Sequence, residues 1–347
     1  MSTENTNIVP SNNNNLKPVW FGQKIIQEKT TVADAFNKCG LSWRVEKEPL
    51  YMEGGNGNFI AVRDNFLTVR NDLVKSDARR VLGVVKGRYE PIQNVESFSV
   101  VDSIVEESDA VVETAGVLKN GRIVYMLINL PGKVMMKEDI LEKYILITNR
   151  HDGKGCMKAL YTNVRVVCMN TLMLAIKSAE HGLNIRHARN KNEQIAIARK
   201  LLKDSSAYYG AMVDVYKQLA EHKVNTAFVN GYIEALVPNK KDNEESTKIG
   251  NIRNRIRDLF YKDQAGFDMD GVAGTAYGLL NATTQYIDHE RTTRARGETS
   301  KVESRIDSTF FGSGSIMRQT AFSLLCREAG IDNAGRLTPS EEALTIN

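Results

Sequence analysis

The 347-residue chain has an ordinary globular composition, with 42% hydrophobic and 25% charged residues and a formal net charge of +4. This length and apolar share allow two domains, or one large domain with an appendage. No apolar run is long enough to cross a membrane, and the polar N-terminus lacks the basic start and apolar stretch of a secretory signal. The four cysteines form no CxxC pair, so neither a zinc knuckle nor a dithiol motif is indicated, and we expect a cytoplasmic protein.

The N-terminal stretch predicts an arm followed by a short helix. Residues 1–18 are rich in asparagine and poor in apolar residues, which is typical of a disordered arm. Thr30 or Thr31 is placed to cap a helix over residues 32–39, and Gly40 is placed to end it.

Paired strands are expected next. Alternating apolar and polar residues predict strands at 41–52 and 59–65, joined by a GGNGN loop. Residues 79–93 predict a further strand pair that turns at Lys86-Gly87.

A helix and a second hairpin follow. Asn94 is placed to cap a helix over residues 95–108, with Glu96 in its first turn. Asn120-Gly121 stands between two β-rich runs, which is the strongest short signal for a hairpin. We therefore expect residues 19–187 to form a domain that mixes helices with antiparallel hairpins.

The chain becomes helical after this domain. The expected fold class is α+β, an antiparallel β-hairpin sheet with helices, followed by an all-helical C-terminal half at 188–335 and a loose tail at 336–347. Helices are predicted over residues 171–182, 191–223, 226–237, 247–263, 271–290 and 314–330.

Several stretches together resemble the DUF932 family of uncharacterised phage and plasmid proteins. They occur in the family's order: TAGVLKNGRIVYMLI (114–128), LITNRHDGKG (146–155), VRVVCMNTLMLA (164–175) with IRH (185–187), and GTAYGLLNATTQYIDHER (274–291) followed by FFGSG (310–314). The resemblance implies a mobile-element context, and hence the cytoplasm of a host cell, but no settled reaction.

The segment from Tyr144 to His187 gathers the polar residues most suited to a site. Arg150 and His151 follow a predicted strand and are placed to contact a ligand or phosphate, with Asp152 orienting the imidazole. The alternative is a structural turn, in which Asp152 bonds local backbone and Gly153 adopts a positive φ.

The candidate catalytic residues are His151, Asp152, Cys168 and His187. Cys168 precedes a predicted helix N-terminus, which lowers a nearby thiol's pKa, and either histidine could act as its base. The alternative is a cysteine buried among valines. No spacing typical of zinc occurs, and no GxxxxGKS or GxGxxG motif is present, so we expect neither a metal nor a cofactor.

Basic residues suggest a polyanionic partner. The expected phosphate contacts share a place in clustered basic stretches, and two tyrosines offer stacking surface. These candidates are Arg150, Arg165, Arg186, His187, Arg189, Arg253, Arg257, Arg291 and Arg294, with Tyr89 and Tyr161. The alternative for any single cluster is a solvated helix surface.

Three functions follow from these patterns. The leading hypothesis is an accessory of phage or plasmid DNA metabolism that binds single-stranded or recombining DNA without sequence preference, and that forms homo-oligomers as annealing recombinases do. The first alternative is an enzyme acting on a nucleotide or nucleic-acid phosphate, with a site made of His151, Asp152, Arg165, Cys168 and His187. The second alternative is a protein-binding factor that blocks a host defence system.

Overall fold

The computed structural model describes residues 31–165, 171–172, 183–203, 205–239, 246–293 and 300–331. Within these residues the strands form two antiparallel sheets in the N-terminal half, and helices make up the C-terminal half, so the α+β class is confirmed. The single sheet expected from the sequence is corrected to two sheets. The predicted arm, the predicted tail, Cys168 and Arg294 all lie outside the described residues.

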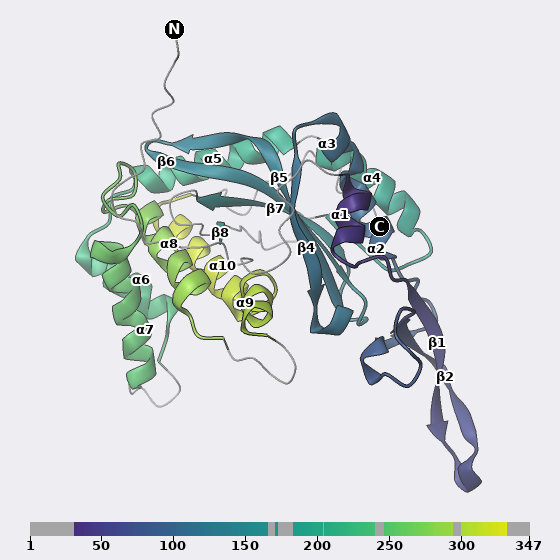
Figure 1. Ribbon diagram of the computed structural model, residues 1–347. Helices are drawn as coiled ribbons and strands as arrows, with labels where there is room; N and C mark the ends of the chain where they lie inside the picture. Colours follow the sequence, from purple (N-terminus) through teal and green to yellow (C-terminus); the bar gives the residue numbers. More distant parts are fainter. Residues whose placement is uncertain are drawn as a thin grey trace.

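The small sheet has the order β1-β2-β3, with strands β1 (Val45–Glu53), β2 (Phe59–Arg70) and β3 (Val81–Lys86). Its first two strands form a long hairpin that projects from the rest of the molecule (Figure 1). The predicted second strand after Lys86-Gly87 is wrong, because residues 89–93 form no strand. The Lys47 ammonium instead donates to the carbonyl oxygens of Gly87 and Tyr89.

The large sheet has the order β4-β5-β6-β7-β8, and β9 also pairs with β7. Its strands are β4 (Val111–Leu118), β5 (Ile123–Met136), β6 (Asp139–Arg150), β7 (Met157–Arg165), β8 (Thr171–Leu172) and β9 (Leu183–Ile185). The hairpin predicted at Asn120-Gly121 is confirmed, with φ of 58° and 95° at these two residues. The helix predicted from Thr171 is wrong at its start, since Thr171 and Leu172 pair with β7.

Helices before and between the sheets are short. Thr31 caps α1 (Val32–Lys38), as predicted, and its hydroxyl accepts from the Asp34 N–H. The helix predicted at 95–108 is broken into α2 (Asn94–Phe98), the 3-10 turn η3 (Ser99–Val101) and α3 (Asp102–Glu107). Gln93, not Asn94, occupies its N-cap and completes a capping box with Glu96.

The C-terminal helices are α4 (Lys191–Lys203), α5 (Ser205–Glu221), α6 (Thr226–Leu236), α7 (Thr247–Asp258), α8 (Ala276–Gln285), α9 (Lys301–Phe310) and α10 (Ser313–Glu328). The π-helical turns η5 (Leu259–Asp263) and η6 (Tyr286–Glu290) extend α7 and α8. Helix α9 was not predicted, and α8 begins after its cap Thr275 instead of at Gly271. None of the helices in the described ranges has the length and apolarity needed to span a membrane.

Both faces of the large sheet are covered. One face contributes Met126, Ile128 and Ile145 to the main apolar core, which continues through α4 and α5 into α8 and α10. The other face carries Tyr125 and Leu146, which pack with α9 in a smaller cluster. The predicted domain boundary at residue 187 stays a prediction.

Candidate nucleic-acid interface around two buried histidines

The backbone of His151 connects the two sheets at the end of β6. Its N–H donates to the carbonyl of Arg122 at 2.9 Å, beside the turn between β4 and β5. Its own carbonyl accepts the hydroxyl proton of Thr68 in the small sheet at 2.7 Å. The residue is fully buried, because its neighbours come from both sheets.

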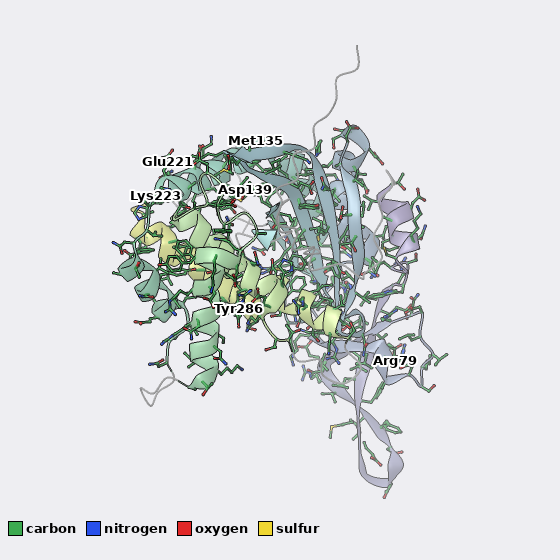
Figure 2. All side chains as sticks on the ribbon, turned by 60° about the vertical axis from the view of Figure 1, so that its left-hand side comes forward. Arg79, Met135, Asp139, Glu221, Lys223 and Tyr286 are labelled. Carbon is green, nitrogen blue, oxygen red and sulfur yellow. The ribbon has the colours of Figure 1, made fainter. Side chains whose placement is uncertain are left out.

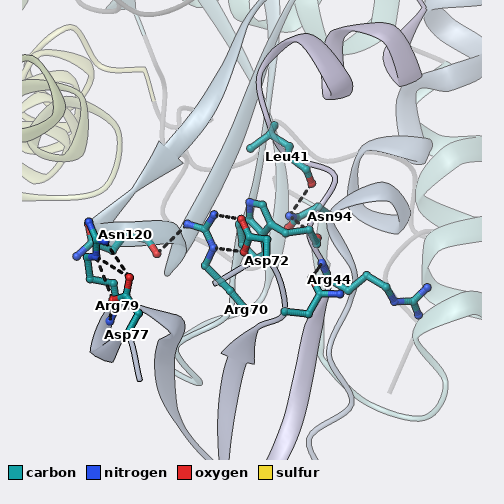
Figure 3. A network of polar contacts seen from close by, with 10 residues as sticks. Leu41, Arg44, Arg70, Asp72, Asp77, Arg79, Asn94 and Asn120 are labelled. Carbon is teal, nitrogen blue, oxygen red and sulfur yellow. Dashed lines mark hydrogen bonds and ion pairs between the residues drawn. The ribbon is translucent and has the colours of Figure 1, made fainter. Parts of the chain in front are cut away.

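Asn94 at the start of α2 orients the His151 imidazole. The Asn94 amide nitrogen donates to the carbonyls of Leu41 and Trp43, so the amide oxygen is the acceptor for His151 Nε2 at 2.7 Å. Figure 3 shows the Asn94 amide directed at the Leu41 carbonyl. The sequence predicted that Asp152 orients the imidazole, whereas in the structure Asn94 does so. His151 Nδ1 meets no hydrogen-bonding partner among the described residues.

His187 lies against the same cluster from the segment after β9. Its Nδ1 accepts from the Ile92 N–H at 3.0 Å, and its ring stacks on Tyr89 with the centroids 4.6 Å apart. The His151 and His187 rings meet edge to face at 6.2 Å between centroids. Two candidate residues that are far apart in the sequence are therefore brought together, as is Tyr89.

Both imidazoles are neutral at ordinary pH. Burial, with a smaller contribution from the nearby His187, lowers the pKa of His151 to about 3. Burial likewise lowers the pKa of His187 to about 4, with Lys191 acting in the same direction. A neutral, enclosed imidazole pair presents no charge to a ligand, so these rings are placed to hold the surrounding segments together.

Asp152 forms part of a tight turn beside this cluster. Although burial opposes its ionisation, hydrogen bonds from the Arg150 guanidinium and the Lys154 N–H hold the pKa of Asp152 below its usual range. Gly153 follows with φ of 73°. These contacts are those of the structural turn that the sequence left open as the alternative; a ligand role for Asp152 stays a prediction.

Gly83 in β3 permits the close contact between the small sheet and this turn. A Cβ at Gly83 would lie 2.5 Å from the Asp152 carbonyl oxygen and 2.6 Å from the Asp152 Cα, and backbone cannot rotate away as a flexible side chain can. We expect Gly83→Ala to lower the free energy of unfolding by about 1–3 kcal/mol, the usual cost of forcing an extra methyl into packed structure. Urea denaturation of the purified variant measures it.

Gly231→Ala is the matched control for Gly83→Ala. Gly231 lies within α6, and nothing lies within 4 Å of the Cβ position. Alanine is the better helix former, so this change should stabilise by about 0.5–1 kcal/mol. Equal denaturation midpoints for Gly83→Ala and the wild type would show that β3 does not pack closely against the turn at Asp152.

Three segments around the buried pair carry a set of exposed cations, here called the basic rim. It consists of Lys86 at the end of β3 and Arg88 after it, Lys154 in the β6–β7 turn and Lys158 in β7, and Arg186 and Arg189 after β9. The segments adjoin, since the Glu90 N–H donates to the His187 carbonyl and Lys158 lies opposite Asn184 in the β7–β9 pair. Only the last two of the six were predicted. Lys86, Arg88 and Lys154 stand beside turn glycines, at Lys86-Gly87-Arg88 and Gly153-Lys154, and this was a signal in the sequence. Lys158 lies within β7 and carried no such signal.

The remaining predicted contacts lie elsewhere. Arg253 is buried and donates to the Val237 carbonyl, while Arg257 and Arg291 are bound to asparagine and serine side chains of neighbouring elements. Tyr161 is partly buried and packs edge to face on Tyr209. Arg165 ends β7, where its backbone pairs with Leu141 of β6, and its place in a binding surface stays a prediction.

The structure therefore defines an α+β protein in which the segments around a neutral, buried histidine pair carry exposed cations. A family model described as "Domain of unknown function (DUF932)" matches residues 81–309, and the chain belongs to this family. The matched region includes all six rim residues and both histidines. Comparisons with curated proteins and with solved structures find no match to either. Within the described residues, no group of three or more His, Cys, Asp or Glu side chains is placed to hold a metal ion.

Proposed function

We propose that this protein binds single-stranded nucleic acid through the basic rim. The observation that carries the proposal is that all six rim cations are exposed and none makes an ion pair within the described part of the chain. Other arginines are neutralised: Arg80 by Glu48, Arg255 by Glu290 and Asp263, and Arg318 by Asp288. Free cations gathered from three segments are suited to phosphates, because binding then breaks no existing ion pair.

Lysine and arginine contacts of this kind are made mainly to the sugar-phosphate backbone of a nucleic acid and less to its bases. Lysine and arginine side chains recognise phosphate charge in any sequence, so we expect binding with little sequence preference. Tyr89 stacks on His187 and is partly exposed, and we propose its exposed part as the surface on which a base stacks. The family resemblance to mobile-element proteins favours DNA metabolism as the setting. The enzymatic alternative receives less support from His151, one of its candidate residues, because this side chain is fully buried.

Salt dependence of oligonucleotide binding tests the rim. Each phosphate contact with a single strand adds about 0.7 to the slope of log affinity against log salt. The double variant Arg88→Gln, Lys158→Gln should therefore lower the slope by about 1.4 and weaken binding at low salt. Fluorescence anisotropy with a labelled thymidine oligomer, followed from about 50 to 200 mM salt, measures both quantities.

Lys262→Gln is the matched control. Lys262 is 64% exposed on η5, outside the rim, and its change removes one positive charge. It should leave the salt slope unchanged. No binding by the wild-type protein at low salt, or an equal loss in Lys262→Gln and the rim variant, would contradict a rim-specific site.

A further inference from the structure

The distal part of the β1–β2 hairpin has no third strand beside it. Strand β3 pairs only with residues 65–69 of β2, whereas β1 and β2 continue pairing out to Glu53 and Phe59. Figure 1 shows this part extending away from both sheets. A two-stranded hairpin without a packed face is marginally stable in water, so this one is suited to gain stability from a partner.

The hairpin tip, residues 51–60, exposes large apolar side chains on both of its faces. Tyr51 and Phe59 lie on one face and are 55% and 73% exposed, while Met52 and Ile60 lie on the other and are each 55% exposed. Side chains of this hairpin project into open space on both sides in Figure 2. Glu53 is the only charged residue of the tip. Clustered aromatic and aliphatic side chains with so little charge are typical of the centre of a protein interface.

A cavity of about 530 Å³, here called the helical cavity, lies on the side of the molecule away from the hairpin. It is formed where α6 begins, at η5 and in the loop before α8, and its apolar lining comes from Val224, Phe260, Tyr261, Phe267 and Ala273. Figure 1 places α6 and α7 on the side away from β1 and β2, so the tip cannot reach the cavity of its own chain. Its size is within the range of pockets that enclose small ligands.

We propose that the hairpin tip of one copy inserts into the helical cavity of a second copy. The apolar side chains of the tip match the apolar lining, and the cavity also presents the exposed Asp268 carboxylate to the amide donors of Asn56 and Asn58. Each copy then offers an unused tip at one end and an unused cavity at the other. Such head-to-tail contacts build a ring where the rotation closes and a filament where it does not.

Complementation between two variants tests this arrangement. The double variant Phe59→Ser, Ile60→Ser removes two large apolar side chains from the tip. Ala273→Lys replaces an exposed alanine of the cavity lining with a long, charged side chain. Light scattering coupled to size exclusion should show a wild-type mass that rises with protein concentration and single chains for either variant alone. An equimolar mixture of the two variants should form pairs, doubling the mass, and nothing larger, because only one intact interface remains.

Ile316→Ser is the matched control, since Ile316 is 66% exposed on α10 and belongs neither to the tip nor to the lining of the cavity, and this variant should assemble like the wild type. A wild-type protein that stays a single chain at every concentration would overturn the proposal. So would assembly that is lost with the tip but kept with Ala273→Lys, which indicates tip-to-tip pairing. Circular dichroism of each variant distinguishes lost assembly from lost folding.

Discussion

Arg318→Met is expected to lower the free energy of unfolding by about 3–5 kcal/mol, which is a large share of the stability of an ordinary domain. The Arg318 side chain is 2% exposed and that of Asp288 is 0% exposed, and the guanidinium bonds both the Asp288 carboxylate and the Thr309 carbonyl. Methionine fills a similar volume but leaves the carboxylate buried without its cation. The midpoint of chemical denaturation measures this loss, provided that the dependence of the unfolding free energy on denaturant concentration is the same in both proteins.

Two further variants separate this mechanism from a general loss of packing. Arg318→Met combined with Asp288→Leu removes both charges, and it should recover part of the stability because the buried carboxylate is removed together with the guanidinium. Arg255→Met removes an arginine whose side chain is 37% exposed and which bonds Glu290 and Asp263, so it should cost within about 1 kcal/mol. Equal losses in Arg318→Met and Arg255→Met would contradict the role of burial.

Elements whose signals are local could be predicted from the sequence. The hairpin at Asn120-Gly121 depends on two residues that tolerate positive φ. The helix after Thr31 depends on the Thr31 hydroxyl, which accepts a hydrogen bond from the N–H of Asp34, three residues later. Helix α9 carried an equally local signal in Ser300 and Glu303, the pattern that begins a capped helix. Its apolar residues form only a narrow stripe in a polar segment, which explains why it was not predicted.

The buried arginines could have been separated from the exposed ones by helical spacing. Arg253 stands four residues after Ile249 and three before Ile256, which places it on the buried face of α7. Arg318 stands three, four and seven residues before Ala321, Phe322 and Leu325, all buried on α10. Counting positive charge without this spacing therefore assigns interior arginines to a binding surface.

The arrangement of the site could be predicted only in part. The segment around His151 and His187 contains the buried pair, but the residue that orients His151 is Asn94, 57 positions earlier in the chain. Such a contact depends on how the two sheets meet, and no local pattern encodes that. The same holds for the basic rim, whose three segments become neighbours only through β7–β9 pairing and the Glu90–His187 hydrogen bond.

Acidification is expected to destabilise the protein between about pH 6.5 and pH 4, through the two buried histidines. In the unfolded chain both take up a proton below a pKa of about 6.5, whereas in the folded protein burial lowers the pKa to about 3 for His151 and about 4 for His187. The unfolded state thus binds more protons in this window, so stability is full above it and falls as the pH drops. Each pH unit costs up to about 1.4 kcal/mol for each histidine.

Urea midpoints at pH 7.5, 6.0 and 5.0 measure this loss, and they avoid the more acidic range in which ordinary carboxylates titrate. His187→Phe keeps an aromatic ring against Tyr89 but has no proton to gain, so its stability should fall between pH 6 and pH 5 by about 1.2 kcal/mol less than that of the wild type. The absolute stability of this variant is lower at every pH, because the Ile92 N–H loses its acceptor, and the slope with pH is therefore the informative quantity. A wild-type protein as stable at pH 5.0 as at pH 7.5 would show that these imidazoles gain protons as easily when folded as when unfolded, and that they are not enclosed as a neutral pair.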